Sequence, residues 1–425
     1  MAKTHADLGF GHMAARREKV SRWESGRVVP SPTTQLAIAH IHHVPHEEVV
    51  RRSWPDWLAL AVPHATLADQ PWTPMGTRTF LHQADRVPAT QAPRQLALTG
   101  RALAEFAHSL VAGVVRPLAF SREGLAVTVE TLALIEARVD ALRQMQFKLT
   151  PTALRPAIRG EYRLLTALLA EGGYGKGTGI RLLELVMRTA GLGGAIGWNL
   201  AEYADAESYY LAAVRAAAAT GVSDAASAFL GNLALVHAHA GTPGEALGLI
   251  EAARTITPSP SPRLRAFLQA RQARAHASRF ETDAGTRALD HAAATLASIP
   301  AHHDVFLQPF VGEIGADWLA LTAGTVWQHM GHAERALEHF SLVLDKSSPG
   351  HTQGTDFPFS ARYLLSIADA QLTLGYTESA TTHAHWAEQL FSGIPPALRH
   401  ELRQGSKASS AGPKASAHGP RMGAG

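Results

Sequence analysis

The sequence predicts an all-α protein in which a small N-terminal helical domain precedes a solenoid of helical repeats. From residue 94 onward, apolar residues follow helical spacing, with hardly any alternation of the kind that strands show. From about residue 195, small residues recur with a period near 34 residues. The 425 residues also exceed what one compact core organises, which favours several domains or a repeat array.

Composition narrows the class of protein. The absence of cysteine excludes disulfides, thiolate zinc sites, iron–sulfur clusters and cysteine nucleophiles. The formal net charge of +3 is too small to indicate a general binder of polyanions, so any nucleic-acid site must be local. No apolar stretch follows a basic N-terminus, and no run of eighteen apolar residues occurs. We therefore expect a cytoplasmic protein without a membrane partner.

The first helix is expected over residues 4–15, with Leu8 and Met13 facing the core. Gly9 and Gly11 weaken it, because glycine costs about 1 kcal/mol relative to alanine in a helix interior.

A short basic helix follows. Val20 and Trp23 are three residues apart, so they share one face and can be buried together. Gly26 suits a left-handed helix end, and Ser31 suits an N-cap with Pro32 in the first helical position. Basic and hydroxyl side chains occupy mainly the other faces, namely Arg16, Arg17, Lys19, Ser21 and Arg22.

The remainder of this domain is predicted as a helix over 32–42, an end at Val44-Pro45, and a short helical turn over 46–52. The expected core residues of the helix are Leu36, Ala39 and Ile41. An aromatic cluster closes the domain and consists of Trp54, Trp57 and Leu58.

The stretch KVSRWESGRVVPSP, residues 19–32, resembles the recognition-helix region of Cro/repressor-type (XRE family) helix-turn-helix regulators. The shared order is Val-Ser, an aromatic residue, Glu, a small residue, Gly, a basic residue and Pro. The resemblance implies a helix-turn-helix DNA-binding domain over residues 1–60. In that family a further helix precedes the one over 4–15, and this chain does not supply it, so we expect a truncated domain that lacks its first helix.

The basic helix is the predicted DNA contact. Arg and Lys bond guanine edges and phosphates, and a Ser hydroxyl bonds a phosphate. The residues expected to contact double-stranded DNA are Arg16, Arg17, Lys19, Ser21 and Arg22. The alternative is an ordinary solvated basic helix.

Residues 61–93 are expected to form a Pro-rich interdomain linker, because prolines disfavour helix and extend the chain. A helical connecting region over 94–194 should hold helices at 94–114, 124–148, 150–170 and 178–190. The glycine-rich run at 172–179 resembles a phosphate loop, yet Lys176 is followed by Gly177 and no strand precedes the run. We interpret it as an interhelical turn.

Repeats of the tetratricopeptide type are expected over 195–398. In the best unit, residues 317–350, the small and aromatic positions are spaced by seven, five and four residues, as in that family, at Gly324, Gly331, Ala336 and Phe340. A second unit has Ala234, Gly241, Ala246, Ile250, Ala253 and Pro258, and a third has Ala368, Gly375, Ala380 and Ala387. Weaker units lie at 195–221 and 263–298. Residues 404–425 are expected to be a disordered tail.

Other patterns are weaker. A histidine group is better explained by surface or packing positions than by a metal, because Pro45 interrupts its helix; its members are His40, His42, His43 and His46. Several aromatic residues of the repeats could line a ligand groove, but their spacing is more typical of packing residues. They are Trp198, Tyr203, Tyr209, Tyr210, Trp318, Trp327 and Trp386. No catalytic constellation and no cofactor motif occurs, so we expect no enzyme activity and no cofactor.

The whole architecture resembles actinobacterial-type regulators that join an XRE-type helix-turn-helix domain to a C-terminal tetratricopeptide-like sensor domain. The resemblance implies a sequence-specific DNA-binding transcription regulator that acts as a homodimer on a two-fold operator. It further implies a peptide, small-molecule or protein effector in the repeat groove. The alternative is a helical-repeat interaction scaffold whose N-terminal domain does not bind DNA.

Overall fold

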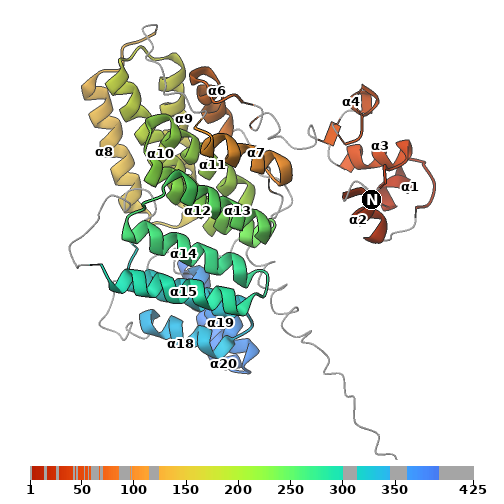
Figure 1. The fold of residues 1–425 in the computed structure, drawn as a ribbon, viewed down its shortest axis with the longest axis vertical. Helices are drawn as coiled ribbons and strands as arrows, with labels where there is room; N and C mark the ends of the chain where they lie inside the picture. The colour runs from red at the N-terminus through yellow and green to blue at the C-terminus, as the bar shows by residue number, and fades with distance from the viewer. Residues whose placement is uncertain are drawn as a thin grey trace, which may run out of the picture. The chain divides into compact units, whose positions relative to one another are not determined.

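A computed structural model gives the fold (Figure 1). It describes residues 2–13, 17–24, 28–41, 44, 46–51, 53–55, 57–58, 67, 70–85, 96, 98–113, 124–299, 314–344 and 361–391. The chain divides into two compact units, residues 1–69 and residues 70–425. Within the described ranges the β-type pairing is limited to an isolated bridge between Ala126 and Gly173, which confirms the all-α prediction. No helix in these ranges is long and apolar enough to cross a membrane.

The first unit consists of short helices. These are α1 (Ala2–Asp7), α2 (Arg17–Glu24), α3 (Pro32–Ile41) and α4 (His46–Arg51). Helix α3 packs against both α1 and α4. The core is built from buried Ile38, Ala39, Val44 and Trp57, with Trp23, Val49, Trp54 and Leu58 packed against it. The predicted aromatic closure of this domain is therefore confirmed.

Two expectations for the first unit are wrong. The first helix ends at Asp7 and does not continue to residue 15, because Gly9 and Gly11 have φ angles of +75° and +85°, which a right-handed helix cannot contain. Ile41 is 39% exposed and does not belong to the core, whereas Ile38, one helical turn earlier, is 5% exposed.

The second unit begins inside the segment expected to be a linker. Residues Pro74–Ala84 form α6, which packs against α9 and α11. Pro74 does not break this helix, because proline in the first turn lacks only an N–H that has no intrahelical acceptor. The Thr73 hydroxyl caps the helix by accepting a hydrogen bond from the Gly76 amide at 3.1 Å. The linker expected over 61–93 is thus wrong for residues 74–84.

The next helices are α7 (Gly100–Val111), α8 (Val129–Met145), α9 (Pro151–Glu171) and α10 (Lys176–Asn199). Helix α7 begins later than the expected residue 94, since Thr99 is extended. Helix α10 runs past residue 190, so the boundary expected between 194 and 195 lies within a helix and is wrong. Residues 172–175 join α9 to α10 as a turn, in which the buried Tyr174 hydroxyl donates to the Leu169 carbonyl at 2.7 Å.

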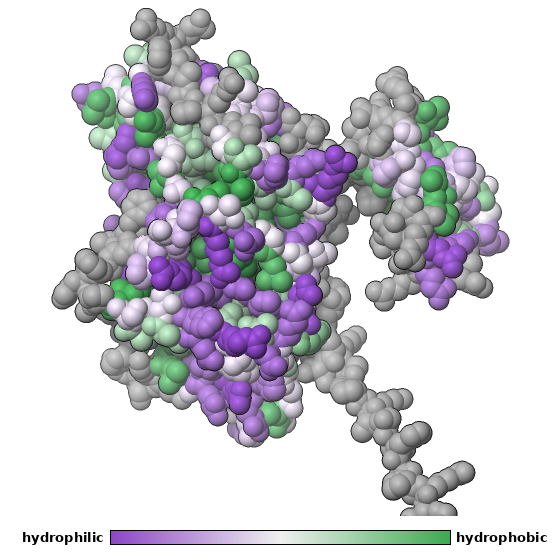
Figure 2. All heavy atoms as spheres, in the orientation of Figure 1, coloured by the Kyte–Doolittle hydropathy of each residue, from purple (hydrophilic) through white to green (hydrophobic). Residues whose placement is uncertain are grey.

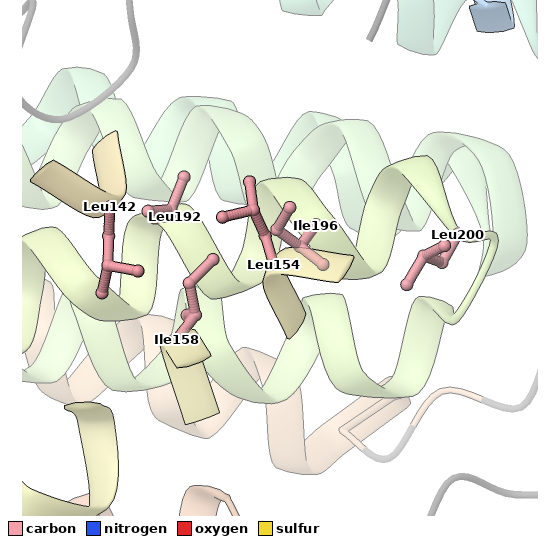
Figure 3. Packing of buried hydrophobic residues seen from close by; sticks show 6 residues of the cluster. All are labelled: Leu142, Leu154, Ile158, Leu192, Ile196 and Leu200. Atoms are coloured by element: carbon pink, nitrogen blue, oxygen red, sulfur yellow. The ribbon is translucent and has the colours of Figure 1, made fainter. Parts of the chain in front are cut away.

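Helices α8, α9 and α10 share a buried aliphatic core (Figure 3). Leu142 comes from α8, and Leu200 follows the end of α10. The other members are Leu154, Ile158, Leu192 and Ile196. Burying such side chains stabilises the fold by about 1.5–3 kcal/mol each.

Consecutive helices pair through the rest of the unit. They are α11 (Tyr203–Thr220), α12 (Ser223–Ala240), α13 (Pro243–Ile256), α14 (Pro262–Ala277), α15 (Thr282–Ala297), α17 (Ala316–His329), α18 (Ala333–Leu344), α19 (Ala361–Thr373) and α20 (Thr377–Phe391). The packed pairs are α10 with α11, α12 with α13, α14 with α15, α17 with α18, and α19 with α20. The first helices of successive pairs are also in contact: α12 packs against α14, α14 against α17, and α17 against α19.

Small residues allow this close pairing. A Cβ atom on Gly324 of α17 would lie 2.6 Å from the ring of Phe340 of α18, so only glycine fits there. Gly331, between these helices, has a φ of +83°, and Gly375 repeats that angle between α19 and α20. Ala336 is fully buried. The expected Pro349 and the tail over 404–425 lie outside the described residues.

The surface of the second unit is mixed. Figure 2 shows mostly hydrophilic side chains over α14 and α15 on the face in view, with hydrophobic residues between them.

Candidate nucleic-acid interface

Helix α2 packs against the core of the first unit through one face. Trp23 is half-buried against the core around Trp57 and Ile38, and Val20, three residues earlier, is half-buried as well. The predicted apolar seam of this helix is therefore confirmed. Because residues three apart lie on the same face, the opposite side of α2 is left to polar residues.

The predicted DNA-contact residues fall into two groups. Lys19 and Arg22 are exposed on α2, three positions apart, so they project from one side of the helix. Arg17 and Ser21 belong to the same helix, but the structure describes only their backbone. Arg16 lies outside the described residues. Glu18 is exposed beside these cations in the first turn.

Hydrogen bonds lie on either side of the segment that joins α2 to α3. At its start, the Val28 amide donates to the Arg22 carbonyl at 3.3 Å. At its end, the Ser31 hydroxyl accepts a hydrogen bond from the Thr34 amide at 3.3 Å, with Pro32 in the first position of α3. The predicted N-cap is confirmed. The predicted cap at Gly26 lies outside the described residues.

Gln35 ties the residues before α3 to the end of the first unit. Its Nε2 donates to the Pro30 carbonyl at 2.9 Å, and its Oε1 accepts from Trp57 Nε1 at 3.1 Å. Both partners are buried. Gln35, which sequence reasoning did not single out, thus joins the residue before Ser31 and α3 to the segment that follows α4.

The charge on this surface is modest. Helix α2, REKVSRWE, carries three cations and two carboxylates. The helix has one exposed ridge that bears a lysine and an arginine, which suits hydrogen bonding to phosphates and guanine edges. Its eight residues span about 12 Å, close to the width of the DNA major groove.

The histidine group does not form a metal site in the described residues. His40 and His46 are exposed, and His42 and His43 lie outside the described residues. No group of three or more His, Asp, Glu or Cys side chains with metal-binding geometry occurs in the described part of the chain.

The aromatic residues of the second unit divide by burial. Tyr203, Tyr209, Tyr210 and Trp327 are buried, whereas Trp198, Trp318 and Trp386 are half-buried. Tyr209 borders a small pocket between α9, α10 and α11, along with Arg155, Arg159, Glu202 and Asp205. Those charges already pair with one another, and the space holds about one water molecule, so we exclude this pocket as an effector site.

Comparison with known proteins adds no relative. Neither the protein-family models nor the curated proteins searched contain a match to this chain.

Proposed function

We propose that the protein is a cytoplasmic, sequence-specific DNA-binding transcription regulator. Helix α2 enters the major groove, and double-stranded DNA is its partner. The observation that carries this proposal is the division of α2 into an anchored face at Trp23 and an exposed ridge at Lys19 and Arg22. The capped start of α3 and the Gln35 bonds support it, because a reading helix needs a rigid orientation against the DNA backbone.

The second unit is proposed to be a tetratricopeptide-like solenoid with a sensing role. Its consecutive helix pairs and the close approach of Gly324 to Phe340 support this assignment. The regulator acts as a homodimer, so that two copies of α2 read half-sites about 34 Å apart. A ligand in the second unit then alters operator affinity by changing which arrangement of the two copies is favoured.

The second candidate is a helical-repeat interaction scaffold whose first unit does not bind DNA. The near balance of charge on α2, three cations against two carboxylates, favours it. A neutral surface gains little from releasing the counterions of DNA, which supplies most nonspecific affinity.

The deciding experiment is selection from fragmented genomic DNA of the source organism with the full chain, followed by sequencing of the retained fragments. The test variant changes Arg16, Arg17, Lys19 and Arg22 to Ala. The control variant changes four exposed arginines of the second unit to Ala, which alters net charge equally: Arg101, Arg138, Arg181 and Arg279.

Retention of a roughly palindromic motif by the wild type and the control, and its loss in the α2 variant, is the expected result. The slope of log affinity against log salt should fall by about 0.9 for each phosphate contact removed. If no motif is enriched, or if all three proteins retain DNA equally, the regulator proposal fails and the scaffold stands.

A further inference from the structure

Seven side chains from six helices meet at one place in the second unit. We name this group the arginine–aromatic cluster, and its members are Arg271, Arg274, Arg362, Trp198, Tyr203, His239 and His329. They come from α10, α12, α14, α17 and α19, the first helices of five consecutive pairs, and from the start of α11. No spacing in the sequence predicts this convergence, since the residues span positions 198 to 362.

Arg362 joins the two ends of this arrangement. Its guanidinium lies over the Trp198 ring, 4.4 Å from the centroid, and donates to the Tyr203 hydroxyl at 3.1 Å. It also donates to the Trp198 carbonyl. The His239 ring completes this wall, at 5.3 Å from Trp198 and 5.0 Å from Tyr203 between ring centroids. Arg362, Trp198 and His239 are half-buried, so solvent reaches them.

Arg274 lies deeper and is only 3% exposed. Its Nη1 donates to the Thr325 carbonyl at 3.1 Å, and its Nη2 lies 2.8 Å from Nε2 of His329. The guanidinium meets both ring nitrogens of His329, since Nη1 also lies 2.6 Å from Nδ1, and Nδ1 is 2.9 Å from the Thr325 carbonyl. Burial and the Arg274 charge hold the pKa of His329 well below its ordinary value, so this histidine is neutral.

Arg271 lies one helical turn before Arg274. It stacks on the Phe267 ring at 4.7 Å and donates to Asn232 Oδ1 at 2.8 Å. The Nε atoms of both Arg271 and Arg274 are buried without a hydrogen-bond acceptor. Among the described residues, no carboxylate forms an ion pair with either guanidinium. Two neighbouring cations, the buried Arg274 and the half-buried Arg271, are therefore balanced only by neutral dipoles and rings.

Such an arrangement is unfavourable without an anion, because a desolvated charge is stable only when it is paired and hydrogen-bonded. Burial lowers the pKa of Arg271 to about 10. Burial, together with the charges of Arg362 and Arg271, lowers the pKa of Arg274 to about 9. The same features make the place favourable for an oxyanion, since charge-assisted hydrogen bonds from arginine are strong where water is excluded.

We propose that the arginine–aromatic cluster binds a small organic anion through its carboxylate or phosphate group. Arg271 and Arg274 supply the positive field, and Arg362 and His239 form the solvent-facing edge. Only one part of this inference rests on the proposed function, namely that the bound anion is the effector of the regulator. Because the cluster joins the first helices of five pairs, bound anion favours the arrangement in which those helices are drawn together.

The test uses the full chain with inorganic phosphate, citrate and chloride at equal ionic strength. Binding is measured by titration calorimetry, and the thermal midpoint is recorded in each salt. The variants are Arg274→Met and the half-buried Arg271→Gln, which removes a charge with less disturbance of packing. Arg265→Met is the matched control, since Arg265 is exposed on the same helix.

Phosphate or citrate is expected to bind the wild type and the control and to raise their midpoints above those in chloride. Affinity should fall at least about tenfold in both cluster variants. Binding of phosphate alone identifies a phosphate-bearing ligand, and binding of citrate alone identifies a carboxylate. Equal binding by all four proteins, or none by the wild type, overturns the proposal. Anion binding without DNA retention sinks the regulator function and leaves the anion site standing.

Discussion

The indole Nε1 of Trp57 donates a hydrogen bond to Oε1 of Gln35 at 3.1 Å, linking the segment after α4 to the first half of α3. Gln35 in turn donates to the Pro30 carbonyl at 2.9 Å. Trp57 is fully buried and meets Trp54 edge to face, with ring centroids 5.6 Å apart. Trp57 is thus linked through Gln35 to Pro30, in the segment that leads into α3.

Replacing Trp57 with Phe tests this link. The ring is retained in part, but Gln35 Oε1 loses its donor and a void remains, so we expect the first unit to lose about 2 kcal/mol of stability. Trp386→Phe, a half-buried position in α20, is the control. Amide hydrogen exchange in α2 and α3 measures the effect. Unchanged exchange in the Trp57 variant would contradict the proposed coupling.

His237 provides a second prediction. It is fully buried, with Nε2 3.2 Å from Glu207 Oε1 and Nδ1 3.3 Å from Glu245 Oε2. Burial alone would lower the pKa of His237, but the two carboxylates outweigh it and raise the pKa to about 9. The same carboxylates accept bonds from the Leu98 and Gly100 amides, so the histidine also organises the start of α7.

The sign of the pH dependence follows from that shift. The folded pKa lies above the unfolded value of about 6.5, so this contribution to stability is complete below pH 6.5 and is lost as pH rises through about 9. We expect about 3 kcal/mol of unfolding free energy to disappear over that window. Burial opposes ionisation of Glu245, but bonds from His237 and the Gly100 amide lower its pKa to about 2, so its contribution is lost only at strong acidity.

His237→Gln should remove the loss of unfolding free energy at alkaline pH. It should also destabilise the protein at neutral pH, because it leaves two carboxylates without their shared cation. Urea unfolding at pH 6 and pH 9.5 measures both effects. The control is His291→Gln, at an exposed position on α15. A wild type and a His237 variant with parallel pH profiles would refute the assignment.

The sequence predicts where helices form better than it predicts which helices pack against one another. Thr150-Pro151 and Ser261-Pro262 are helix starts that local chemistry explains, since each hydroxyl caps the third amide that follows it. The same pattern at Thr73-Pro74 was missed, because several nearby prolines favoured a linker. What distinguishes that segment is packing against α9 and α11, which no local pattern contains.

The candidate sites divide in the same way. Lys19 and Arg22 were identifiable because a short motif fixes core, cap and turn residues together. The arginine–aromatic cluster was not, since Arg274 and Arg362 are 88 residues apart and only the stacking of helix pairs brings them together. Trp198 and Tyr203 are recognisable in the sequence as aromatic candidates, but nothing in their spacing indicates that Arg362 lies over both rings.

Asp85 offers the last prediction, which concerns the docking of α6. At the end of α6, this buried carboxylate accepts hydrogen bonds from Arg159 Nε at 2.9 Å, from the Tyr209 hydroxyl at 2.7 Å, and from Arg163. It therefore ties α6 to α9 and α11. Asp85→Asn removes the charge that balances two arginines at nearly constant volume, and we expect a loss of about 3 kcal/mol.

The matched control is Asp140→Asn, which breaks an ion pair between Arg188 and a half-exposed carboxylate and should cost less than about 1 kcal/mol. Hydrogen exchange separates a local effect from a global one. If Asp85 docks α6, the amides of residues 74–84 exchange faster in the Asp85 variant, while those of α14 and α15 change little. Equal acceleration throughout the second unit would mean that Asp85 supports the whole array and not the attachment of α6 alone.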